Sequence, residues 1–229
     1  MRTVSVFLSI LLALTLSVRA SASSEELADV YFYCENADKR IALTFDDGPH
    51  YKYTEEILDI LAEYDIKATF FVVGQLAERY PELILRELAE GHEVASHTWS
   101  HPHLSGLSPT ALSSELSTTE ELLYELAEYR PRLFRPPEGK YSDSVRRVAA
   151  ELDYELVLWT VDTRDWAHTP SDKIVETVIN NTESGSIILC HDFIGSNSPT
   201  PEALRRFIPE LKRNGYEFVT VSELILGDE

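Results

Sequence analysis

The sequence predicts an α/β fold, a distorted (β/α) barrel of about seven parallel strands in a single domain. Short β-rich apolar runs alternate with amphipathic stretches along most of the 229 residues, which indicates parallel strands joined by helical crossovers. No glycine-rich phosphate-binding sequence follows the first run, and polar residues cluster where several runs end. These two observations favour a barrel over an open sheet.

Seven apolar runs are the expected strands, at residues 41–45, 69–73, 93–95, 133–134, 156–161, 187–190 and 218–221. Between them, apolar residues recur at helical spacing, most clearly at residues 57–64, 83–88 and 112–126. Ser108 before Pro109 predicts a helix start, as does Ser171, and Gly215 predicts a helix end.

Residues 1–22 are predicted to be a secretory signal peptide. Arg2 is followed by an apolar run over residues 4–18 and then by the cleavage pattern Ala20-Ser21-Ala22. The apolar run is short and rich in Ser and Thr for a membrane span, although an uncleaved membrane anchor is the alternative. The protein is therefore expected to be secreted or extracytoplasmic, at the cell envelope.

Beyond the signal, residues 23–38 are expected to form an N-terminal tether and residues 39–226 the folded domain. Cys34 and Cys190 are the only cysteines. An oxidising compartment would permit a disulfide between them. Cys190, however, lies within an apolar run, which is typical of a buried thiol, so the pairing stays open.

The formal net charge of −19 excludes some classes of partner. A chain this acidic is unsuited to nucleic acid and to an anionic membrane surface. The acidic residues keep a secreted protein soluble and say nothing about its fold. No stable protein partner is expected, and the chain is expected to be a monomer.

Unusual polar residues fall at or just after the ends of five predicted strands. They are Asp46-Asp47, His97 with His101, Arg135, Asp162 with Asp165-Trp166, and His191-Asp192. In a parallel β/α barrel the carboxyl ends of the strands share one face, which is where active sites are assembled. The sequence therefore predicts an active site on this face.

His97 and His101 are the first candidates for metal ligands. A spacing of four places both imidazoles on one side of a helical turn, although such pairs are more often surface or capping residues. Asp47 completes a set of two histidines and one carboxylate, which is typical of a catalytic metal site with positions open for water and substrate. His50 and His103 flank these residues and are not expected to be ligands.

Asp46 is the candidate general base. Adjacent carboxylates such as Asp46 and Asp47 repel each other unless a positive group lies beside them. Neighbouring residues of a strand point to opposite sides, so Asp46 is better placed to take a proton from water than to share the metal. The alternative is a carboxylate that only bonds to backbone amides at the strand end.

His191 is the candidate acid for protonating a leaving group. It must be protonated to act, and a nearby carboxylate, either Asp165 or Asp162, would raise its pKa. Leu189 shares a strand face with His191 and is expected to line the same pocket. Trp166 would form the other apolar wall, with plain core packing as the alternative.

Arg135 precedes two prolines, Glu138 and Gly139, a rigid sequence that would fix its side chain. The same turn would present a backbone N–H of Glu138 or Gly139 to an oxyanion. A buried arginine needs a carboxylate partner, and both Asp46 and Asp165 are expected on the correct face.

Five segments together resemble the ordered motifs of the polysaccharide deacetylases, carbohydrate esterase family 4, also called the NodB homology domain. They are Thr44-Phe45-Asp46-Asp47-Gly48, His97-Thr98-Trp99-Ser100-His101-Pro102, Arg135-Pro136-Pro137, Asp162-Thr163-Arg164-Asp165-Trp166 and Leu189-Cys190-His191-Asp192. The resemblance covers residues 39–224. It implies a barrel with fewer than eight complete units and metal-dependent removal of acetyl groups from N-acetylated glycans.

The resemblance also implies a role for each matching residue. Asp46 would be the base, oriented by Arg135, and His191 the acid, supported by Asp165. The ligands of one divalent metal ion, usually Zn²⁺ with Co²⁺ or Mn²⁺ possible, would be Asp47, His97 and His101.

The pocket for the acetyl group would be lined by Trp166 and Leu189. At the next position the chain departs from the family, because an aromatic residue usually follows the two prolines and here it is Glu138. The backbone N–H of Glu138 can still bind the oxyanion, but the surface that faces the sugar must differ.

The expected function is removal of N-acetyl groups from N-acetylglucosamine in peptidoglycan or a chitin-type oligosaccharide. One alternative is an O-acetyl esterase acting on acetylated xylan, because the same site can attack an ester. Another is a catalytically silent domain that binds glycan at the cell envelope. The silent alternative is disfavoured because base, metal ligands and acid are all present.

Overall fold

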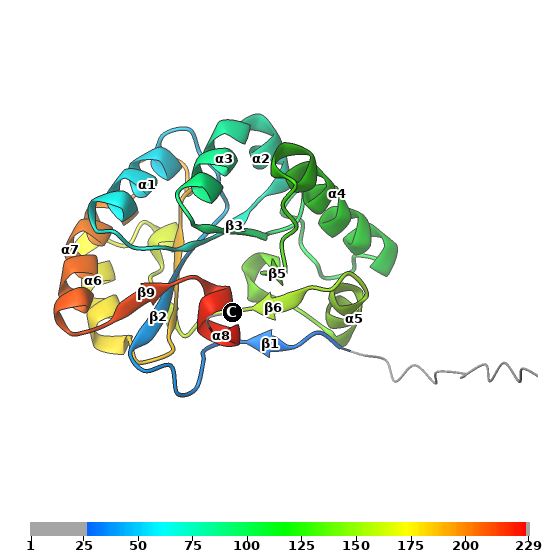
Figure 1. Cartoon of the computed structure of the whole chain (residues 1–229). Coiled ribbons are helices and arrows are strands. Elements are labelled where there is room, and N and C mark those ends of the chain that lie inside the picture. The colour runs from blue at the N-terminus through cyan, green and yellow to red at the C-terminus, as the bar shows by residue number, and fades with distance from the viewer. Residues whose placement is uncertain (1–26, 228–229) are drawn as a thin grey trace, which may run out of the picture.

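Nine strands form one curled sheet with helices on its outer side in the computed structural model, which describes residues 27–227 (Figure 1). The order is β1-β6-β5-β4-β3-β2-β8-β7, with β9 paired to β2, and each of these strand pairs is parallel. The strands are β1 Val30–Tyr31, β2 Arg40–Asp46, β3 Thr69–Val72, β4 Glu93–Ser96, β5 Leu133–Phe134, β6 Glu155–Val157, β7 Val161–Asp162, β8 Ile187–His191 and β9 Glu217–Val219. The predicted α/β fold, a distorted barrel of parallel strands, is confirmed.

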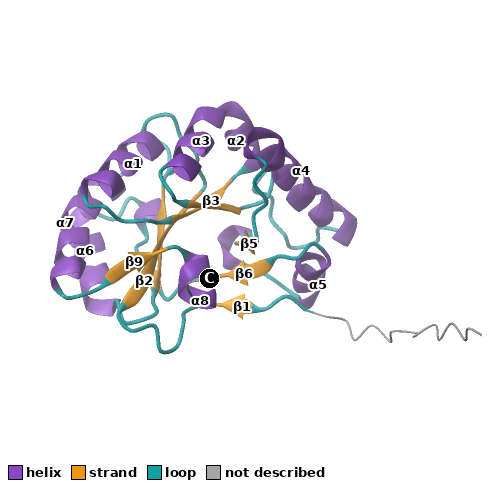
Figure 2. Cartoon of the chain, in the orientation of Figure 1, coloured by secondary structure: helices purple, strands orange, loops and turns teal. Residues whose placement is uncertain are grey.

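Helices connect the strands and cover the sheet (Figure 2). The α-helices are α1 Tyr53–Glu63, α2 Gly74–Arg79, α3 Pro81–Ala89, α4 Pro109–Ala127, α5 Asp143–Glu151, α6 Ser171–Asn181, α7 Thr200–Arg213 and α8 Val221–Leu226. Two 3₁₀ turns, η1 Pro137–Gly139 and η2 Asp165–Ala167, follow β5 and β7.

The helix boundaries predicted from sequence agree with the structure. Ser108 caps α4 by accepting a hydrogen bond from the N–H of Ala111. Helix α6 begins at Ser171, and the capping position is taken by Pro170, which makes no side-chain capping bond. Gly215, with a φ of +82°, follows the end of α7 and supplies the left-handed conformation that ends helices.

The predicted strand at 156–161 is wrong as a single element, because it forms two short strands, β6 next to the edge strand β1 and β7 at the other edge of the sheet. The segment between β6 and β7 crosses from one sheet edge to the other. The N–H of Leu158 donates to the carbonyl of Tyr31 of β1, and the N–H of Thr160 donates to the carbonyl of Ile187 of β8. Three residues therefore join the two edges and force the sheet to curl into a barrel.

Strand β1 accounts for the ninth strand. It lies in the segment that the sequence analysis assigns to the tether, and it pairs with β6 through Val30 and Tyr31. Ala28 and Ala37 on either side of it are buried. A strand of two residues gives too short an apolar pattern to be recognised in sequence.

Strand register brings the predicted catalytic residues together. Asp46 of β2 pairs with His191 of β8, and Thr44 pairs with Leu189. Because side chains alternate along a strand, these four point to the same face of the sheet. That face is the inside of the barrel, since the intervening Phe45 packs in the cluster that the helices cover.

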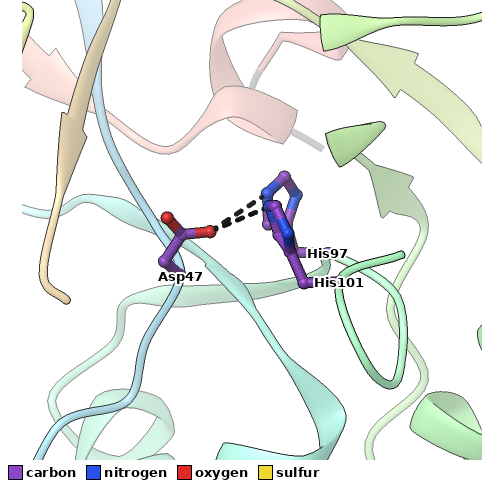
Figure 3. Close-up of side chains that lie close together, drawn as sticks. All are labelled: Asp47, His97 and His101. Carbon is purple, nitrogen blue, oxygen red and sulfur yellow. Dashed lines mark ion pairs between the residues drawn. The ribbon is translucent and has the colours of Figure 1, made fainter. Parts of the chain in front are cut away.

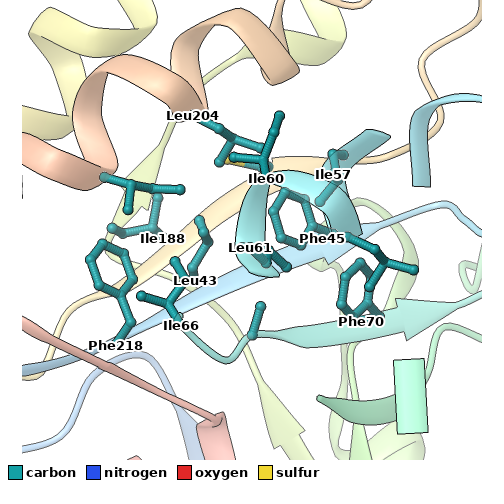
Figure 4. Packing of buried hydrophobic residues seen from close by; sticks show 14 of the residues in the cluster. Leu43, Phe45, Ile57, Ile60, Leu61, Ile66, Phe70, Ile188, Leu204 and Phe218 are labelled. Carbon is teal, nitrogen blue, oxygen red and sulfur yellow. The ribbon is translucent and has the colours of Figure 1, made fainter. Parts of the chain in front are cut away.

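The main hydrophobic core lies between the sheet and the outer helices (Figure 4). Leu43 and Phe45 of β2 pack there with Ile57 and Leu61 of α1 and Leu204 of α7. A smaller cluster fills the barrel interior, with Ala42, Phe71, Leu133, Val157 and Ile187 among its members. Apolar side chains therefore fill the interior of the barrel away from the carboxyl ends of the strands. Polar side chains gather at those carboxyl ends.

The predicted signal peptide, residues 1–22, lies outside the described residues. Within residues 27–227, no helix combines the length and apolar character needed to cross a membrane. Cys34 and Cys190 are both unpaired, and Cys190 is fully buried in the main core, so the open disulfide is not formed.

Leu43→Ala should lower the free energy of unfolding by about 2–5 kcal/mol, because it leaves a cavity in the main core. The matched control is Leu85→Ala on α3, where the side chain is 45% exposed and the change should stay within about 0.5 kcal/mol. Urea unfolding with an unchanged m value measures both. Equal losses in the two variants would contradict the assignment of the core.

Candidate metal and catalytic site

A cavity of about 360 Å³ opens at the carboxyl ends of the strands. All predicted site residues line it except Arg135 and Asp165, which are buried behind it. The lining is Asp46, Asp47, His97, His101, Glu138, Gly139, Trp159, Asp162, Trp166, Leu189 and His191. Five segments that are distant in sequence therefore meet in one place, as the positions of the polar clusters predict.

Asp47, His97 and His101 form a cluster suited to a metal ion (Figure 3). The Oδ1 atom of Asp47 lies 3.4 Å from Nε2 of His97 and 3.3 Å from Nε2 of His101. The three ligand atoms lie within 4.8 Å of one another, and Oδ1 of Asp47 is buried without a hydrogen-bond partner. Two imidazoles and one carboxylate converging on a common point fit a divalent ion such as zinc.

The histidines around Asp47 favour the ionised form of its carboxylate. Burial opposes ionisation of Asp47, but the adjacent His97, with His191 and His101, outweighs burial and lowers the pKa of Asp47. A ligand carboxylate must be deprotonated, so this bias favours metal binding.

The helical turn expected for the two histidines is wrong. Residues 97–104 form an irregular loop after β4, in which Thr98 and His101 have φ angles of 73° and 53°. Asp47, on the facing loop, has a φ of 73°. Non-glycine residues rarely adopt this left-handed conformation, and such strain persists only where surrounding contacts impose it.

Those contacts are hydrogen bonds from neighbouring elements. The N–H of His97 donates to Val72 of β3, the N–H of Gly74 donates to Thr98, and the N–H of His101 donates to the hydroxyl of Thr98. The loop that carries both imidazoles is thus held by tertiary hydrogen bonds rather than by a helix.

The ring of His97 is oriented by the backbone of Arg135. Its Nδ1 lies 2.7 Å from the carbonyl oxygen of Arg135, and a carbonyl can only accept, so Nδ1–H is the donor. The lone pair of Nε2 then faces Asp47. Such an outer hydrogen bond fixes both the tautomer and the angle of a metal-ligating histidine.

Asp46 is paired with Arg135, which settles one of the alternatives left open by the sequence. Nη1 of Arg135 donates to Oδ1 of Asp46 at 2.6 Å and to Thr44 Oγ1 at 2.8 Å. Nε and Nη2 donate to the carbonyls of Val157 and Leu158, each at 3.1 Å. Arg135 is fully buried, and burial lowers its pKa while the charge of Asp46 opposes this. The free oxygen of Asp46, Oδ2, lies 3.9 Å from Nε2 of His97 and so faces the metal cluster.

His191 is held by Asp165 rather than by Asp162. Oδ1 of Asp165 lies 2.7 Å from Nδ1 of His191, and Oδ2 accepts from the backbone N–H of His191 at 2.8 Å. Thr200 also donates to Oδ2, whereas Asp162 accepts from the N–H of Arg164. Burial acts to lower the pKa of His191, but Asp165, with Asp46 and Asp47, raises it to about 9.

The pocket walls include one aromatic residue that the sequence analysis did not assign to the site, Trp159. Its ring packs on Gly139, where an added Cβ would lie 2.6 Å from it. Gly139 also has a φ of +66°, so both space and backbone require glycine. Trp159 stands inside an apolar run, and its only sequence signal is an aromatic residue at a strand end. Trp166 is half exposed and Leu189 buried on the pocket wall.

His50 and His103 lie outside the cluster of Asp47, His97 and His101. Nδ1 of His50 accepts from the N–H groups of Lys52 and Tyr53 and so caps the start of α1. Nδ1 of His103 lies 3.2 Å from the carboxylate of Glu138.

Asp192 is a buried residue whose contribution the sequence analysis did not identify. Its Oδ2 accepts from the hydroxyl of Thr54 at 2.5 Å, and Thr54 accepts from the N–H of His50 at 2.7 Å. The N–H of Asp192 donates to the carbonyl of Asp46. Burial raises the pKa of Asp192 to about 7, and the charge of Asp47 adds to this. Asp192 therefore anchors both ends of the loop that carries the aspartate pair.

Comparison with known proteins places the chain among enzymes that remove acetyl groups. Residues 34–157 match the sequence profile described as polysaccharide deacetylase. A peptidoglycan-N-acetylglucosamine deacetylase of Bacillus cereus is 43% identical over 192 residues, which cover 83% of this chain and 90% of that protein.

Two solved structures extend the likeness to the fold. The Bc1960 peptidoglycan N-acetylglucosamine deacetylase superimposes with a TM-score of 0.84 at 36% identity, over 88% of this chain and 94% of that one. A family 4 acetyl xylan esterase from Clostridium thermocellum, in complex with a cobalt ion, superimposes with a TM-score of 0.75 at 38% identity. The match covers 81% of this chain and 90% of that one.

Asp165→Asn should lower the pKa of His191 from about 9, because burial then acts against the charged imidazole without an opposing carboxylate. NMR titration of the imidazole measures this directly. Asp162→Asn is the matched control and should leave the pKa of His191 unchanged.

The same substitution has a consequence for stability. A histidine with a raised pKa stabilises the fold fully below its unfolded value of about 6.5, and this stabilisation is lost as pH rises through about 9. Asp165→Asn should remove that pH dependence. An unchanged titration of His191 in Asp165→Asn would show that another group sets its pKa.

Gly48→Ala should weaken zinc binding and lower the free energy of unfolding by about 1–3 kcal/mol, because overpacking displaces the loop beside Asp47. An added Cβ would lie 2.0 Å from Oδ2 of Asp192, which Thr54 holds in place. Gly106→Ala is the control for a destabilising change of the same kind away from Asp192: its φ of +85° makes alanine unfavourable there too, but nothing lies within 4 Å of its Cβ position. It should leave zinc affinity, measured by competition with a chelator, at the wild-type value. Equal zinc affinity in both variants would contradict this account of Asp192.

Proposed function

The chain belongs to the polysaccharide deacetylase family, and from this premise we propose that it is a metal-dependent hydrolase that removes N-acetyl groups from N-acetylglucosamine in glycans. The substrate is peptidoglycan or a chitin-type oligosaccharide. One observation carries the proposal: a candidate base, a three-ligand metal cluster and a candidate acid line the same cavity. Together they supply each group that amide hydrolysis requires.

Asp47, His97 and His101 hold the metal ion. Zinc fits this donor set best, with cobalt or manganese as possible substitutes. When bound, the ion makes water more acidic and polarises the carbonyl of the acetamide.

Asp46 acts as the general base. Its Oδ1 is bound by Arg135, so Oδ2 is the atom that accepts a proton from the attacking water. Arg135 holds the carboxylate so that its other oxygen is aimed at the metal cluster. Arg135 is therefore a positioning residue that acts through Asp46.

His191 acts as the general acid. Its Nδ1 is engaged by Asp165, so the proton passes from Nε2 to the leaving amine. A pKa of about 9 keeps the imidazole protonated at neutral pH, as an acid must be. The carboxylate of Asp165 orients the ring of His191 and favours its protonated form.

The acetyl group is held by a backbone donor and by apolar walls. The N–H of Gly139 donates to Pro136 within its own turn, which leaves the N–H of Glu138 as the donor to the developing oxyanion. Trp166 and Leu189 form the walls that receive the methyl group.

A second candidate activity is hydrolysis of O-acetyl esters. The likeness to an acetyl xylan esterase at 38% identity favours it, and the same base, metal and oxyanion donor can act on an ester. The two activities differ in the leaving group, because an amine needs a proton from His191 more than an alcohol does.

The protein acts outside the cytoplasm, at the cell envelope, and as a monomer. Support for the location comes from relatives named for peptidoglycan and from the sequence of residues 1–22, which has the features of a secretory signal.

Acetate release from a small panel tests the proposal: chitooligosaccharides, peptidoglycan fragments and acetylated xylan, each with metal-stripped and zinc-loaded protein. Zinc-loaded protein should release acetate from the N-acetylated glycans, and metal-stripped protein should lose at least about a hundredfold in rate. Faster release from acetylated xylan would favour the esterase. Absence of release from every glycan would contradict both activities.

Asp46→Asn is the discriminating variant, because it removes the base and retains the metal ligands. It should lower kcat by about 10²–10⁴-fold while zinc stoichiometry stays at one per chain. Asp59→Asn, an exposed carboxylate on α1, is the matched control and should keep full activity. Normal activity in Asp46→Asn would exclude this mechanism.

A further inference from the structure

The hydrogen bonds of Arg135 fix only part of the position of its guanidinium group. Four of them run from its N–H groups to Asp46, Thr44 and the carbonyls of Val157 and Leu158. All N–H groups of a guanidinium lie in its plane, so these bonds hold the edge of the group. The two flat faces carry no donor, and the tilt of the plane therefore depends on what packs against them.

The ring of Phe71 packs against the guanidinium of Arg135. The Cζ atom of Arg135 lies 4.0 Å from the ring centroid of Phe71. A guanidinium within about 6 Å of an aromatic face is attracted to the electrons of the ring, more strongly where both groups are out of water. Both side chains are fully buried, so water does not weaken this contact.

Strand register explains why Phe71 lies at this point. Phe71 of β3 pairs with Asp46 of β2, so both side chains face the interior of the barrel at the same level. On its other side Phe71 pairs with Ala95 of β4, a small residue that leaves room for the ring. Phe71 belongs to the apolar cluster that fills the barrel interior, and it does not line the catalytic cavity. It is therefore placed to contact Arg135 and not a substrate.

The ring of Trp159 is a second aromatic neighbour of the same guanidinium. Its centroid lies 5.6 Å from Cζ of Arg135, and Trp159 lines the cavity whereas Arg135 does not. The attraction at this distance is weaker than that of Phe71. The closer aromatic contact thus comes from the barrel interior, on a residue that the chemistry proposed above does not use.

We propose that Phe71 is a positioning residue for the catalytic base: its ring sets the tilt of the Arg135 guanidinium and, through it, the direction of the free oxygen of Asp46. This inference rests on the proposed function for the role of Asp46. A change of tilt moves Nη1, which lies 2.6 Å from Oδ1 of Asp46, and so turns Oδ2 away from the metal cluster. Misplacing a catalytic group by about 1 Å can lower the rate by about a hundredfold.

Phe71→Leu tests the proposal, because it removes the ring and keeps an apolar side chain. It should lower kcat by roughly five- to thirtyfold, the factor that corresponds to a buried cation–π contact. KM should stay unchanged, because Phe71 does not line the cavity. A loss confined to KM, or an unchanged kcat, would overturn the proposal.

Phe207→Leu on α7 is the matched control. Phe207 is fully buried in the main core and makes no cation–π contact within residues 27–227. Its substitution should leave kcat per folded molecule at the wild-type value. An equal loss of kcat in Phe71→Leu and Phe207→Leu would show a general effect of core cavities and overturn the positioning role.

Fluorinated phenylalanines separate the electrons of the ring from its volume. Each fluorine withdraws electron density from the ring face and changes the packing little. Singly, doubly and triply fluorinated phenylalanine in place of Phe71 should lower kcat stepwise, and the same series in place of Phe207 should not change it. The series decides the question even where Phe71→Leu fails to fold. A flat response at Phe71 would show that the ring acts by packing alone, which would overturn the proposal.

The Nε–H proton of Arg135 gives an NMR readout that does not depend on acetate release. In wild type this proton should be shifted by the ring current of Phe71 and should exchange slowly with water, because it is buried and donates to the carbonyl of Val157. Phe71→Leu should remove the shift and speed the exchange by at least about tenfold. If wild type releases no acetate while this signal still depends on Phe71, the proposed function fails and the positioning of Arg135 stands. Normal acetate release with a signal that is the same in both proteins would overturn this inference alone.

Discussion

The site depends on one buried ion pair, between Arg135 and Asp46. A fully buried guanidinium is unfavourable unless its N–H groups find partners, and here Asp46, Thr44 and the carbonyls of Val157 and Leu158 accept from it. The backbone carbonyl of the same arginine accepts from His97. One residue therefore aims the base with its side chain and a metal ligand with its backbone. It also links β2 to the end of β6, so the curl of the sheet and the geometry of the site cannot be changed separately.

Each of the two adjacent aspartates has its own set of positive groups. Asp46 is neutralised by Arg135, whereas Asp47 faces two histidines and the metal that they would share. The two adjacent carboxylates therefore each have a positive partner, unlike a pair of carboxyl groups that share one proton. Separate roles as base and ligand follow from this separation of charge. The pairing of Asp46 with His191 in the strand register then places base and acid on adjacent strands, both facing one cavity.

The sequence predicts the fold class and most of the site because both follow from local patterns. Strand ends mark where polar residues converge, and the spacing of Asp47, His97 and His101 indicates a metal whatever the backbone between them does. The helical turn could not be corrected from sequence, because the left-handed conformation of Thr98 depends on hydrogen bonds from β3 and α2. The break between β6 and β7 and the anchoring by Asp192 likewise depend on which strands become neighbours. Tertiary contacts of this kind leave no periodic signal.

The left-handed conformations at Asp47, Thr98 and His101 have a further consequence for the lifetime of the protein. Two of the three residues are themselves the expected ligands, so the chain holds strain in the atoms that receive the metal. A ligand that binds only the folded state stabilises it by mass action, so without the metal the hydrogen bonds of the loop must oppose this strain alone. Newly made chains that have not yet acquired metal are then the ones most exposed to proteolysis. Metal supply would thereby set how much of this enzyme accumulates as well as how fast it works.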